Sequence, residues 1–278
     1  MKKMIIAGAG GMLGKAFYQE FKNNYNLTCT DIDLNESWLT YNDFGDLESY
    51  KELCFKIRPD ILIHLAWQGL PNYMSLHHFE IELPVQYDFL SALIKEGLQS
   101  LVVVGTCFEY GMQSNSLSEE LDTKPSNPYG FAKDCLRKQL KFLKKQHNFK
   151  LTWARLFYLY GDGQSDSSIY SQLKTAIQNS ELKFDMSEGE QLRDYLPVEK
   201  VAKYLIDLAL LKKDIGVVNV CSGVPISVRN LVENWLDENN WGIELNLGFY
   251  PYPNYEPMNF WGDNTYLNKL INSTNNTD

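Results

Sequence analysis

Short apolar runs alternate with longer helical patterns over the first 157 residues of this 278-residue chain. Two of these runs, 61–66 and 101–105, are almost wholly apolar, as is typical of strands that are buried on both faces. The alternation predicts βαβ units, and therefore an α/β fold with a doubly wound parallel sheet that helices cover on both sides. We expect strands at 3–9, 26–32, 60–66, 100–106 and 150–157, and helices near 12–22, 46–57, 76–96 and 128–147.

A glycine-rich turn, GAGGMLG, follows the first of these strands and opens the first helix. Gly8, Gly11 and Gly14 would let a dinucleotide pyrophosphate approach the backbone and the amino terminus of that helix. Asp31 ends the second strand, twenty residues after Gly11, where a dinucleotide fold places a carboxylate on the adenosine ribose. A carboxylate there repels the 2′-phosphate of NADP, so the turn predicts a Rossmann domain that favours NAD, with NADP as the alternative. Asp33 competes with Asp31 for this role.

The pattern loosens after residue 157. Helices are expected near 168–179, 198–212 and 227–238, with a strand at 216–220, whereas the Tyr- and Pro-rich segment 247–261 predicts no regular structure. The last residues, from 271 onward, are expected to fray. We therefore expect an NAD(P)-binding domain over 1–165, to which 193–222 returns, and a smaller C-terminal lobe for substrate, built from 166–192 and 223–278.

Composition narrows the classes of partner. The net charge of −9 and the lack of a basic block argue against nucleic acid and anionic membrane surfaces. Five scattered cysteines without a C-x-x-C pair favour free thiols in a reducing compartment, and we expect no metal site. The apolar run near the amino terminus is broken by glycines and no run approaches 18 apolar residues, so a cytoplasmic protein is expected.

The sequence PYGFAK carries the strongest chemical signal. Tyr129 and Lys133 are four residues apart on a predicted helix, so phenol and ammonium share one helix face. A lysine cation favours the phenolate form of a neighbouring tyrosine, which would make Tyr129 an acid or base near neutral pH. A hydroxyl that polarises the reacting oxygen would complete such a site. Thr106 supplies one at the end of a strand, 23 residues before Tyr129.

These features together resemble the short-chain dehydrogenase/reductase superfamily, in its extended branch of NAD-dependent epimerases and dehydratases that modify nucleotide sugars. The three-and-three glycine spacing, GDL at 45–47, HLAW at 64–67 and the Arg-Asp-Tyr segment at 193–195 are similar to motifs of that branch. The resemblance covers nearly the whole chain. His64 is expected to be a packed histidine without a chemical role.

The resemblance implies a role for each matching residue. Tyr129 would transfer a proton, Thr106 would steady the reacting oxygen, and Lys133 would hold the nicotinamide ribose, while hydride passes between nicotinamide and a sugar carbon. Cofactor contacts are expected from the glycines, Asp31 and both Tyr129 and Lys133, and further from Met12, Leu13, Asp46, Leu47, Leu65 and Ala66. Substrate contacts are expected from Trp67, from Tyr158, which stands where the family often has an asparagine, and, on the diphosphate, from Arg193, for which an intramolecular salt bridge is the alternative. Glu109, on the loop after Thr106, is either a substrate contact or a structural residue.

The residues after Thr106 bear on the reaction. Dehydratases of the family carry Asp-Glu there, whereas this chain has Cys107 and Phe108, and a phenylalanine cannot exchange protons. Cys107 is either an acid/base near the sugar or a buried small hydrophobe. The expectation is a homodimeric reductase of a nucleotide-activated 4-keto-6-deoxyhexose, or the reverse oxidation, in cell-surface polysaccharide synthesis. An epimerase with tightly bound NAD and a non-enzymatic NAD(P)-binding regulator are the alternatives. Phe79, Val85 and Leu93 could form the dimer contact or the core face of their helix.

Overall fold

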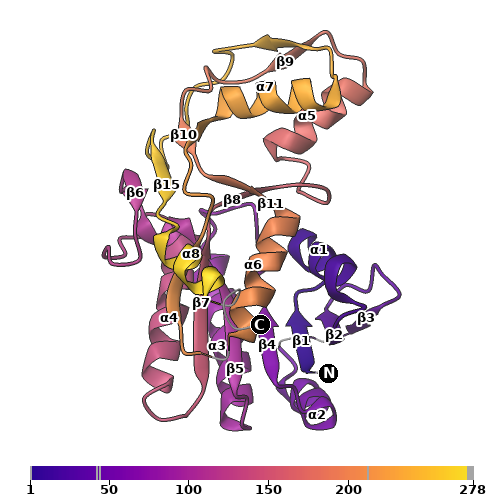
Figure 1. Ribbon diagram of the computed structural model, residues 1–278, viewed down its shortest axis with the longest axis vertical. Coiled ribbons are helices and arrows are strands. Elements are labelled where there is room, and N and C mark those ends of the chain that lie inside the picture. The colour runs from indigo at the N-terminus through magenta and orange to yellow at the C-terminus, as the bar shows by residue number, and fades with distance from the viewer. Residues whose placement is uncertain (1, 42, 44, 212, 274–278) are drawn as a thin grey trace.

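A computed structural model describes residues 2–41, 43, 45–211 and 213–273; the side chains of Leu47 and Cys54 lie outside this description. Seven parallel strands form the central sheet in the order β12-β7-β5-β4-β1-β2-β3 (Figure 1). Their bounds are Lys3–Ala7 (β1), Asn26–Asp31 (β2), Leu39–Tyr41 (β3), Ile61–His64 (β4), Ser100–Thr106 (β5), Lys150–Leu156 (β7) and Gly216–Val220 (β12). The predicted doubly wound parallel sheet is confirmed.

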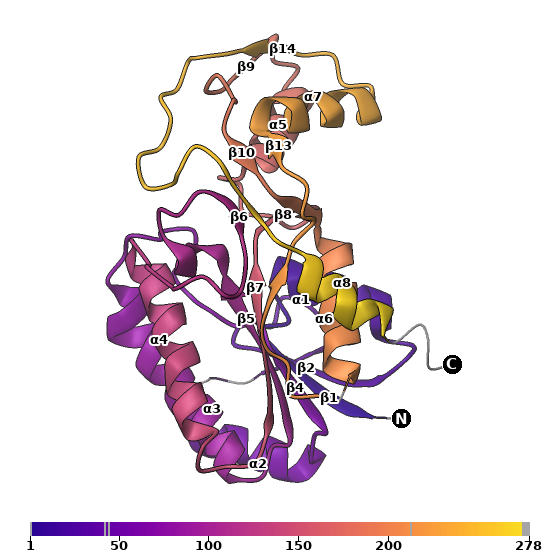
Figure 2. The ribbon, with the colours of Figure 1, turned by 60° about the vertical axis from the view of Figure 1, so that its left-hand side comes forward.

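Alternate residues of each strand face opposite layers of the core, which explains the continuous apolar runs. Met4 and Ile6 of β1 belong to the cluster under helices α1, α6 and α8, whereas Ile5 and Ala7 belong to the cluster under α2, α3 and α4 (Figure 2). The first layer contains Met12–Phe21 (α1), Val198–Leu210 (α6) and Thr265–Asn272 (α8), and the second contains Leu47–Ile57 (α2), Leu83–Lys95 (α3) and Pro128–Leu143 (α4). A π-helical segment, His78–Glu82 (η1), precedes α3, and a 3-10 helix, Cys107–Tyr110 (η2), follows β5.

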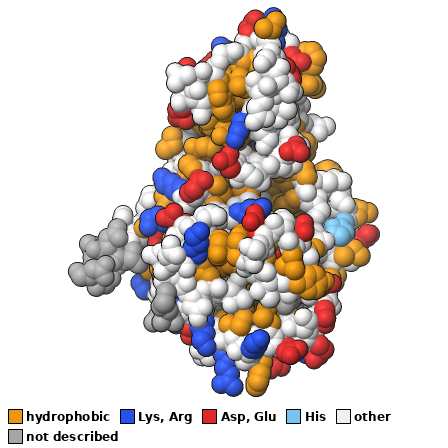
Figure 3. Space-filling view, turned by 90° about the vertical axis from the view of Figure 1, so that its right-hand side faces the viewer, with side chains coloured by type: hydrophobic (Ala, Val, Ile, Leu, Met, Phe, Trp, Pro, Cys, Tyr) orange, Lys and Arg blue, Asp and Glu red, His pale blue; other side chains and the backbone are white. Residues whose placement is uncertain are grey.

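A smaller lobe with its own apolar cluster stands above the carboxyl ends of the sheet strands (Figure 1). Ile169–Gln178 (α5) and Val228–Asn239 (α7) supply much of that cluster, with Leu173 and Trp235 at its centre. The molecular surface is hollowed where the lobe meets the main body (Figure 3). Short strand pairs complete this region: Lys183–Asp185 (β9) with Glu244–Asn246 (β14), Leu192–Arg193 (β10) with Ile226–Ser227 (β13), and Tyr158–Tyr160 (β8) with Tyr195–Pro197 (β11).

Two expectations about the last 32 residues are wrong. Helix α8 packs against the main core through Leu267 and Leu270, so the assignment of all of 223–278 to the small lobe fails for 265–272. The strand Phe260–Gly262 (β15) pairs with Asn115–Leu117 (β6), although 247–261 predicted no regular structure. Such a short strand has no periodicity of its own and is fixed by its partner. The frayed terminus was predicted from 271, and its residues 274–278 lie outside the described part of the chain.

No helix within the described ranges has both the length and the apolar character that crossing a membrane requires.

Candidate active site

The glycine turn lies where the chain order of the sheet reverses, between β1 and its neighbours β2 and β4. Gly8 has a positive φ of 81°, and a Cβ on it would lie 2.5 Å from the backbone nitrogen of Ala66. A Cβ on Gly14 would lie 2.4 Å from Cα of Ala9. These two glycines are therefore required by close backbone packing of strand, turn and helix.

Gly11 differs from the other two glycines of the motif. The nearest atom that a Cβ on Gly11 would meet is the carbonyl oxygen of Gly8, at 3.7 Å, which is an ordinary contact. Gly11 is also the N-cap of α1, and among the described residues no side chain caps this helix and no acidic residue occupies its first turn. Free backbone amides at a helix amino terminus attract anions. The open space at Gly11 and the positive electrostatic field of the helix terminus thus fit a pyrophosphate group.

Asp31 is tied directly to this turn. Its Oδ2 accepts a hydrogen bond of 2.8 Å from the amide of Gly10, and its Oδ1 accepts one of 3.2 Å from the amide of Asp33. The carboxylate therefore stands beside the turn at the end of β2, the place where a dinucleotide ribose would need it. Asp33 itself is exposed. The ribose contact remains a prediction for Asp31.

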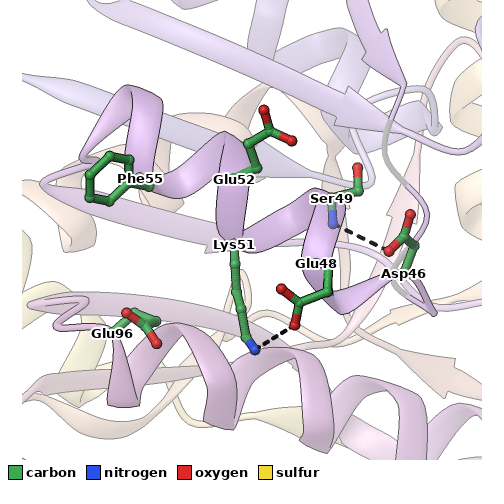
Figure 4. Close-up of a pocket in the computed structure, with 7 residues that line it drawn as sticks. All are labelled: Asp46, Glu48, Ser49, Lys51, Glu52, Phe55 and Glu96. Atoms are coloured by element: carbon green, nitrogen blue, oxygen red, sulfur yellow. Dashed lines mark hydrogen bonds and ion pairs between the residues drawn. The ribbon is translucent and has the colours of Figure 1, made fainter.

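Four of the other predicted cofactor residues lie at or next to the turn, whereas Asp46 lies at the start of α2 and the side chain of Leu47 is outside the description. Leu65 donates its amide to the Ala7 carbonyl at 2.8 Å, and Ala66 lies against Gly8, so both line the gap between β1 and β4. Met12 and Leu13 form the first turn of α1, where Leu13 also packs against the core. Asp46 begins α2 and accepts the Ser49 amide at 3.2 Å, in a surface hollow lined with carboxylates (Figure 4).

Thr106, Tyr129 and Lys133 are brought together by the end of β5 and the first turns of α4. The Thr106 hydroxyl lies near enough to the phenol of Tyr129 to lower its pKa as a hydrogen-bonding neighbour. Lys133 donates from Nζ to the Val104 carbonyl at 2.9 Å, and its Nζ lies 4.1 Å from the centroid of the Trp67 ring. The same Trp67 ring lies 6.0 Å from the ring of Tyr129. A single indole therefore contacts both members of the tyrosine–lysine pair.

Burial controls the protonation of this pair. Tyr129 is 7% exposed, and burial raises the pKa of its phenol. The neighbouring Thr106 hydroxyl lowers this pKa, but by less than burial raises it. Burial lowers the pKa of Lys133 to about 7, although the Glu109 and Glu82 carboxylates oppose this shift. Loss of hydration dominates the pKa of Tyr129, and the neighbouring Tyr73 raises it further, while an acidifying effect of Lys133 on the phenol stays a prediction. Tyr129 is thus protonated at neutral pH and is placed as a proton donor.

Aromatic rings enclose the Tyr129 phenol. Ring centroids of His78, Tyr73 and Phe108 lie 5.3, 5.6 and 6.2 Å from that of Tyr129. His78 accepts from Trp67 Nε1 at Nδ1, at 3.1 Å, and its Nε2 lies 2.8 Å from the Asn72 carbonyl, an arrangement that suits the neutral ring with a proton on Nε2. Sequence reasoning missed Tyr73 and His78, because the loop that carries them has no spaced motif.

Comparison with known proteins identifies the family. The model of the NAD dependent epimerase/dehydratase family matches residues 4–221. The chain belongs to this family. It is accordingly an NAD(P)-dependent enzyme with a Rossmann-type fold, and the predictions of family, fold, cofactor and enzyme class are confirmed.

Three similar proteins illustrate the range of this family. The chain is 28% identical over 268 residues to dTDP-6-deoxy-L-talose 4-dehydrogenase (NAD(+)) of Aggregatibacter actinomycetemcomitans, covering 93% of this chain and 98% of that protein. UDP-glucose-4-epimerase from Stenotrophomonas maltophila, solved with bound NAD and formylated UDP-arabinopyranose, has a TM-score of 0.86 at 16% identity and covers 98% of this chain and 93% of that one. RMD from Pseudomonas aeruginosa, complexed with NADPH, has a TM-score of 0.82 at 20% identity with the same coverage of 98% and 93%.

Glu109 is a structural residue in this family member, and its predicted substrate contact does not fit the structure. The side chain is fully buried. Its Oε1 accepts from the Thr106 amide at 3.0 Å and from Trp153 Nε1 at 2.8 Å, while its Oε2 accepts from Arg155 Nε at 2.7 Å. Thr106 and Glu109 form a capping box that opens η2. Glu109 therefore positions Thr106 and leaves no oxygen open to a substrate.

Cys107 fits the second of its two interpretations. Its side chain is 5% exposed and packs in an apolar cluster with Tyr110, Leu117, Phe157, Cys221 and Phe260. Burial raises the pKa of its thiol, so the thiol stays protonated and behaves as a small hydrophobe. The cysteines whose side chains are described, Cys29, Cys107, Cys135 and Cys221, are free.

His64 is a packed histidine, as expected. It is fully buried, and its Nε2 lies 2.6 Å from Oε1 of Gln86, whose amide nitrogen donates to Glu82 at 3.0 Å. Burial, with the nearby Lys133 charge, lowers the pKa of His64 to about 3, so its ring is neutral.

Arg193 does not present a free guanidinium to the site. Its side chain is 4% exposed and forms an ion pair of 2.8 Å with Glu256, a residue that sequence reasoning did not select. Tyr158, the other residue predicted to contact substrate, donates its hydroxyl to Glu256 at 2.6 Å. The structure thus brings Arg193 and Tyr158 together through a carboxylate from the segment that follows β14. The predicted diphosphate contact of Arg193 does not match this arrangement.

Proposed function

We propose that this protein is an NAD(P)-dependent oxidoreductase that acts at C4 of a nucleotide-activated sugar. The favoured direction is reduction of a nucleoside-diphosphate 4-keto-6-deoxyhexose, with the reverse oxidation carried out by the same residues. One observation carries the proposal: the buried phenol of Tyr129 and the ammonium group of Lys133 meet at the Trp67 ring, next to Ala66 and the glycine turn, and Thr106 lies beside the phenol. The 28% identity to a nucleotide-sugar 4-dehydrogenase over 93% of the chain supports the same position on the sugar.

The protein residues have separate tasks in this reaction. The amides at Gly11 and the first turn of α1 would hold the pyrophosphate, and Asp31 the adenosine ribose. A bound nicotinamide supplies the hydride. Tyr129 gives its phenolic proton to the oxygen on C4 as that oxygen becomes an alcohol, and the Thr106 hydroxyl holds the oxygen in place. Lys133, near the tyrosine, would hold the nicotinamide ribose through hydrogen bonds from its Nζ.

Elimination of water is disfavoured at this site. Cys107 and Phe108 are 5% and 8% exposed and occupy the two positions directly after Thr106. Neither offers a carboxyl group, and burial keeps the Cys107 thiol protonated. The polar groups next to the reacting oxygen are thus those of an alcohol–ketone conversion.

A Tyr129→Phe variant tests the assignment. With a panel of nucleotide-activated sugars and their 4-keto forms, we expect wild type to consume or form NAD(P)H stoichiometrically, and the variant to lose about 10²- to 10⁴-fold in kcat while it still binds the dinucleotide. Tyr73→Phe is the matched control, since it removes a hydroxyl from a neighbouring ring and should leave most activity. Unchanged turnover of Tyr129→Phe would overturn the mechanism, and turnover without added cofactor would replace the reductase by an epimerase.

We also propose that the enzyme acts in the cytoplasm, in the synthesis of cell-surface polysaccharide sugars, as a homodimer. Leu93 is 3% exposed and belongs to the core, and Val85 packs against the same cluster, so these two residues form the core face of α3. Among the exposed apolar side chains, Ile81 lies on η1 and Phe131 and Phe142 lie on α4, and these three are 52%, 49% and 66% exposed. Phe79 packs on Phe131 with ring centroids 6.1 Å apart. This surface supports a dimer contact.

A further inference from the structure

Arg193 has its donors engaged by the protein itself. Its Nε and Nη2 donate to Oε2 of Glu256 at 3.2 and 2.8 Å, and its Nη1 donates to the carbonyls of Leu192 and Met258 at 2.9 and 3.0 Å. The guanidinium also lies 4.6 Å from the ring centroid of Phe260. The edge that would grip an anion in bidentate fashion is the one that Glu256 occupies. A second anion could reach this edge only by displacing Glu256.

The pair is screened from water and nearly neutral as a unit. The side chains of Arg193 and Glu256 are 4% and 10% exposed, and Oε1 of Glu256 accepts the Tyr158 hydroxyl at 2.6 Å. In such surroundings an unbalanced charge is costly, and removal of one partner leaves the other uncompensated. The Glu256 carboxylate therefore cancels a cation that would otherwise attract negative charge into this wall of the site.

The pair stands close to the reacting residues. Tyr73, whose ring lies 5.6 Å from that of Tyr129, has its pKa raised to about 12 by burial and then by the neighbouring Cys107, Glu256 and Tyr255. Cys107, which directly follows Thr106, packs in one apolar cluster with Phe260, whose ring centroid lies 4.6 Å from the Arg193 guanidinium. Glu256 thus shares neighbours with Tyr129 and Thr106, where the sugar ring must lie if its C4 is to react.

We propose that Glu256 is a specificity-determining residue that restricts the substrate to sugars whose ring carries no acidic group. This inference rests on the proposed function, since it assumes a nucleotide sugar with its ring near Tyr129. By neutralising Arg193, the Glu256 carboxylate removes this guanidinium as a counter-ion for a hexuronic acid and adds repulsion against the acid. A neutral hexose or deoxyhexose suffers neither penalty, and its hydroxyls can be accommodated beside Tyr158.

The test compares Glu256→Gln with wild type on matched probes. Calorimetry measures Kd for a nucleoside-diphosphate hexose and for the corresponding hexuronic acid, for example UDP-glucose and UDP-glucuronic acid, with uridine, thymidine and guanosine pairs tried in turn. Wild type should bind the neutral sugar at least about tenfold more tightly than the hexuronic acid. In Glu256→Gln, which frees Arg193, the ratio of the two Kd values should be about tenfold smaller. Equal binding of both probes by wild type, or an unchanged ratio in the variant, would overturn the proposal.

Two further variants separate charge from scaffolding. Glu233→Gln makes the same change in the exposed Arg229–Glu233 pair of α7 and should leave the ratio as in wild type. Tyr158→Phe removes the hydrogen bond to Glu256 but keeps both charges, so it should preserve the discrimination. If Glu256→Gln weakens both probes alike, Glu256 acts as a scaffold and the inference is wrong. If wild type binds none of the probe pairs, the failure lies in the proposed function.

Discussion

Lys133 carries an ammonium group into the protein interior, where it is 1% exposed. Its Nζ donates to the Val104 carbonyl and faces the Trp67 ring, but these contacts replace the lost hydration only in part, and burial lowers its pKa to about 7. In the unfolded chain the group titrates near 10.4. Between these two values the unfolded state binds more protons than the folded state, so the contribution of Lys133 to stability rises with pH across this window.

Lys133→Met should remove this pH dependence. Wild type should gain about 1–3 kcal/mol of unfolding free energy relative to Lys133→Met between pH 6 and pH 9, because the folded wild type sheds the buried proton over this range. Chemical denaturation at both pH values measures the difference, with the exposed Lys141→Met as the control that should show none. If the difference in unfolding free energy between wild type and Lys133→Met were the same at both pH values, this would contradict the low pKa of the lysine.

The placement of site residues could be predicted where their partners lie near in sequence. The i, i+4 spacing placed Tyr129 and Lys133 together, and the strand end supplied Thr106, as the structure shows. Arg193 was assigned to substrate from the family resemblance and Glu109 from its place on the loop after Thr106, and the sequence did not reveal the partners that the structure gives them. Arg155 binds Glu109 from 46 residues away and Glu256 binds Arg193 from 63 residues away, and no local pattern announces either pair.

In the unit formed by β1, its turn and α1, one glycine motif provides both close backbone packing and space for a ligand. Gly8 and Gly14 allow backbone segments to touch, whereas Gly11 leaves open space beside the free amides of α1. Sequence spacing predicts all three glycines as cofactor residues. It cannot tell the two packing glycines from the one beside open space, because that difference depends on how closely the backbone atoms of Ala9 and Ala66 approach.

Alanine at two of these positions should separate stability from binding. Gly14→Ala places a methyl 2.4 Å from Cα of Ala9, a backbone atom, and should lower the free energy of unfolding by about 2 kcal/mol or more. Gly11→Ala has an ordinary contact of 3.7 Å and a φ of −75°, so it should fold as stably as wild type. It should nevertheless weaken dinucleotide binding about tenfold by filling the space beside the helix terminus. Denaturation and NADH fluorescence titration provide the measurements; equal stability of the two variants would refute this division.

Elements that carry their own periodicity were predicted correctly, and those fixed by distant partners were not. The longer sheet strands and the helices α1 to α7 match the expected segments. The strands β6, β8 and β15 have three residues each and are held by pairing with segments far apart in the sequence. Helix α8 follows the irregular tail and docks on α6, and its position is set by burial of Leu267.

On the scale of the whole molecule, the layer formed by α3 and α4 has exposed apolar side chains on its outer surface. Helices α3 and α4 lie side by side as the outermost layer on their face of the sheet (Figure 2). Phe131 and Phe142 are eleven residues apart on α4, which is close to three full turns, so both project from one face of the helix. An exposed apolar face on an outer layer is a common site of self-association.

A charge on that face should therefore dissociate the homodimer that we propose. We expect wild type to sediment as a dimer and Phe131→Glu as a monomer at micromolar concentration, because a carboxylate buried in an apolar contact without a partner is costly. Phe55→Glu is the matched control: Phe55 is 75% exposed on α2, more than Phe131 at 49%, but it belongs to another helix, so this variant should remain dimeric. If Phe55→Glu dissociates and Phe131→Glu does not, the contact lies on α2. A monomeric wild type would remove the dimer altogether, and would leave the apolar side chains of η1 and α4 to be explained by another partner.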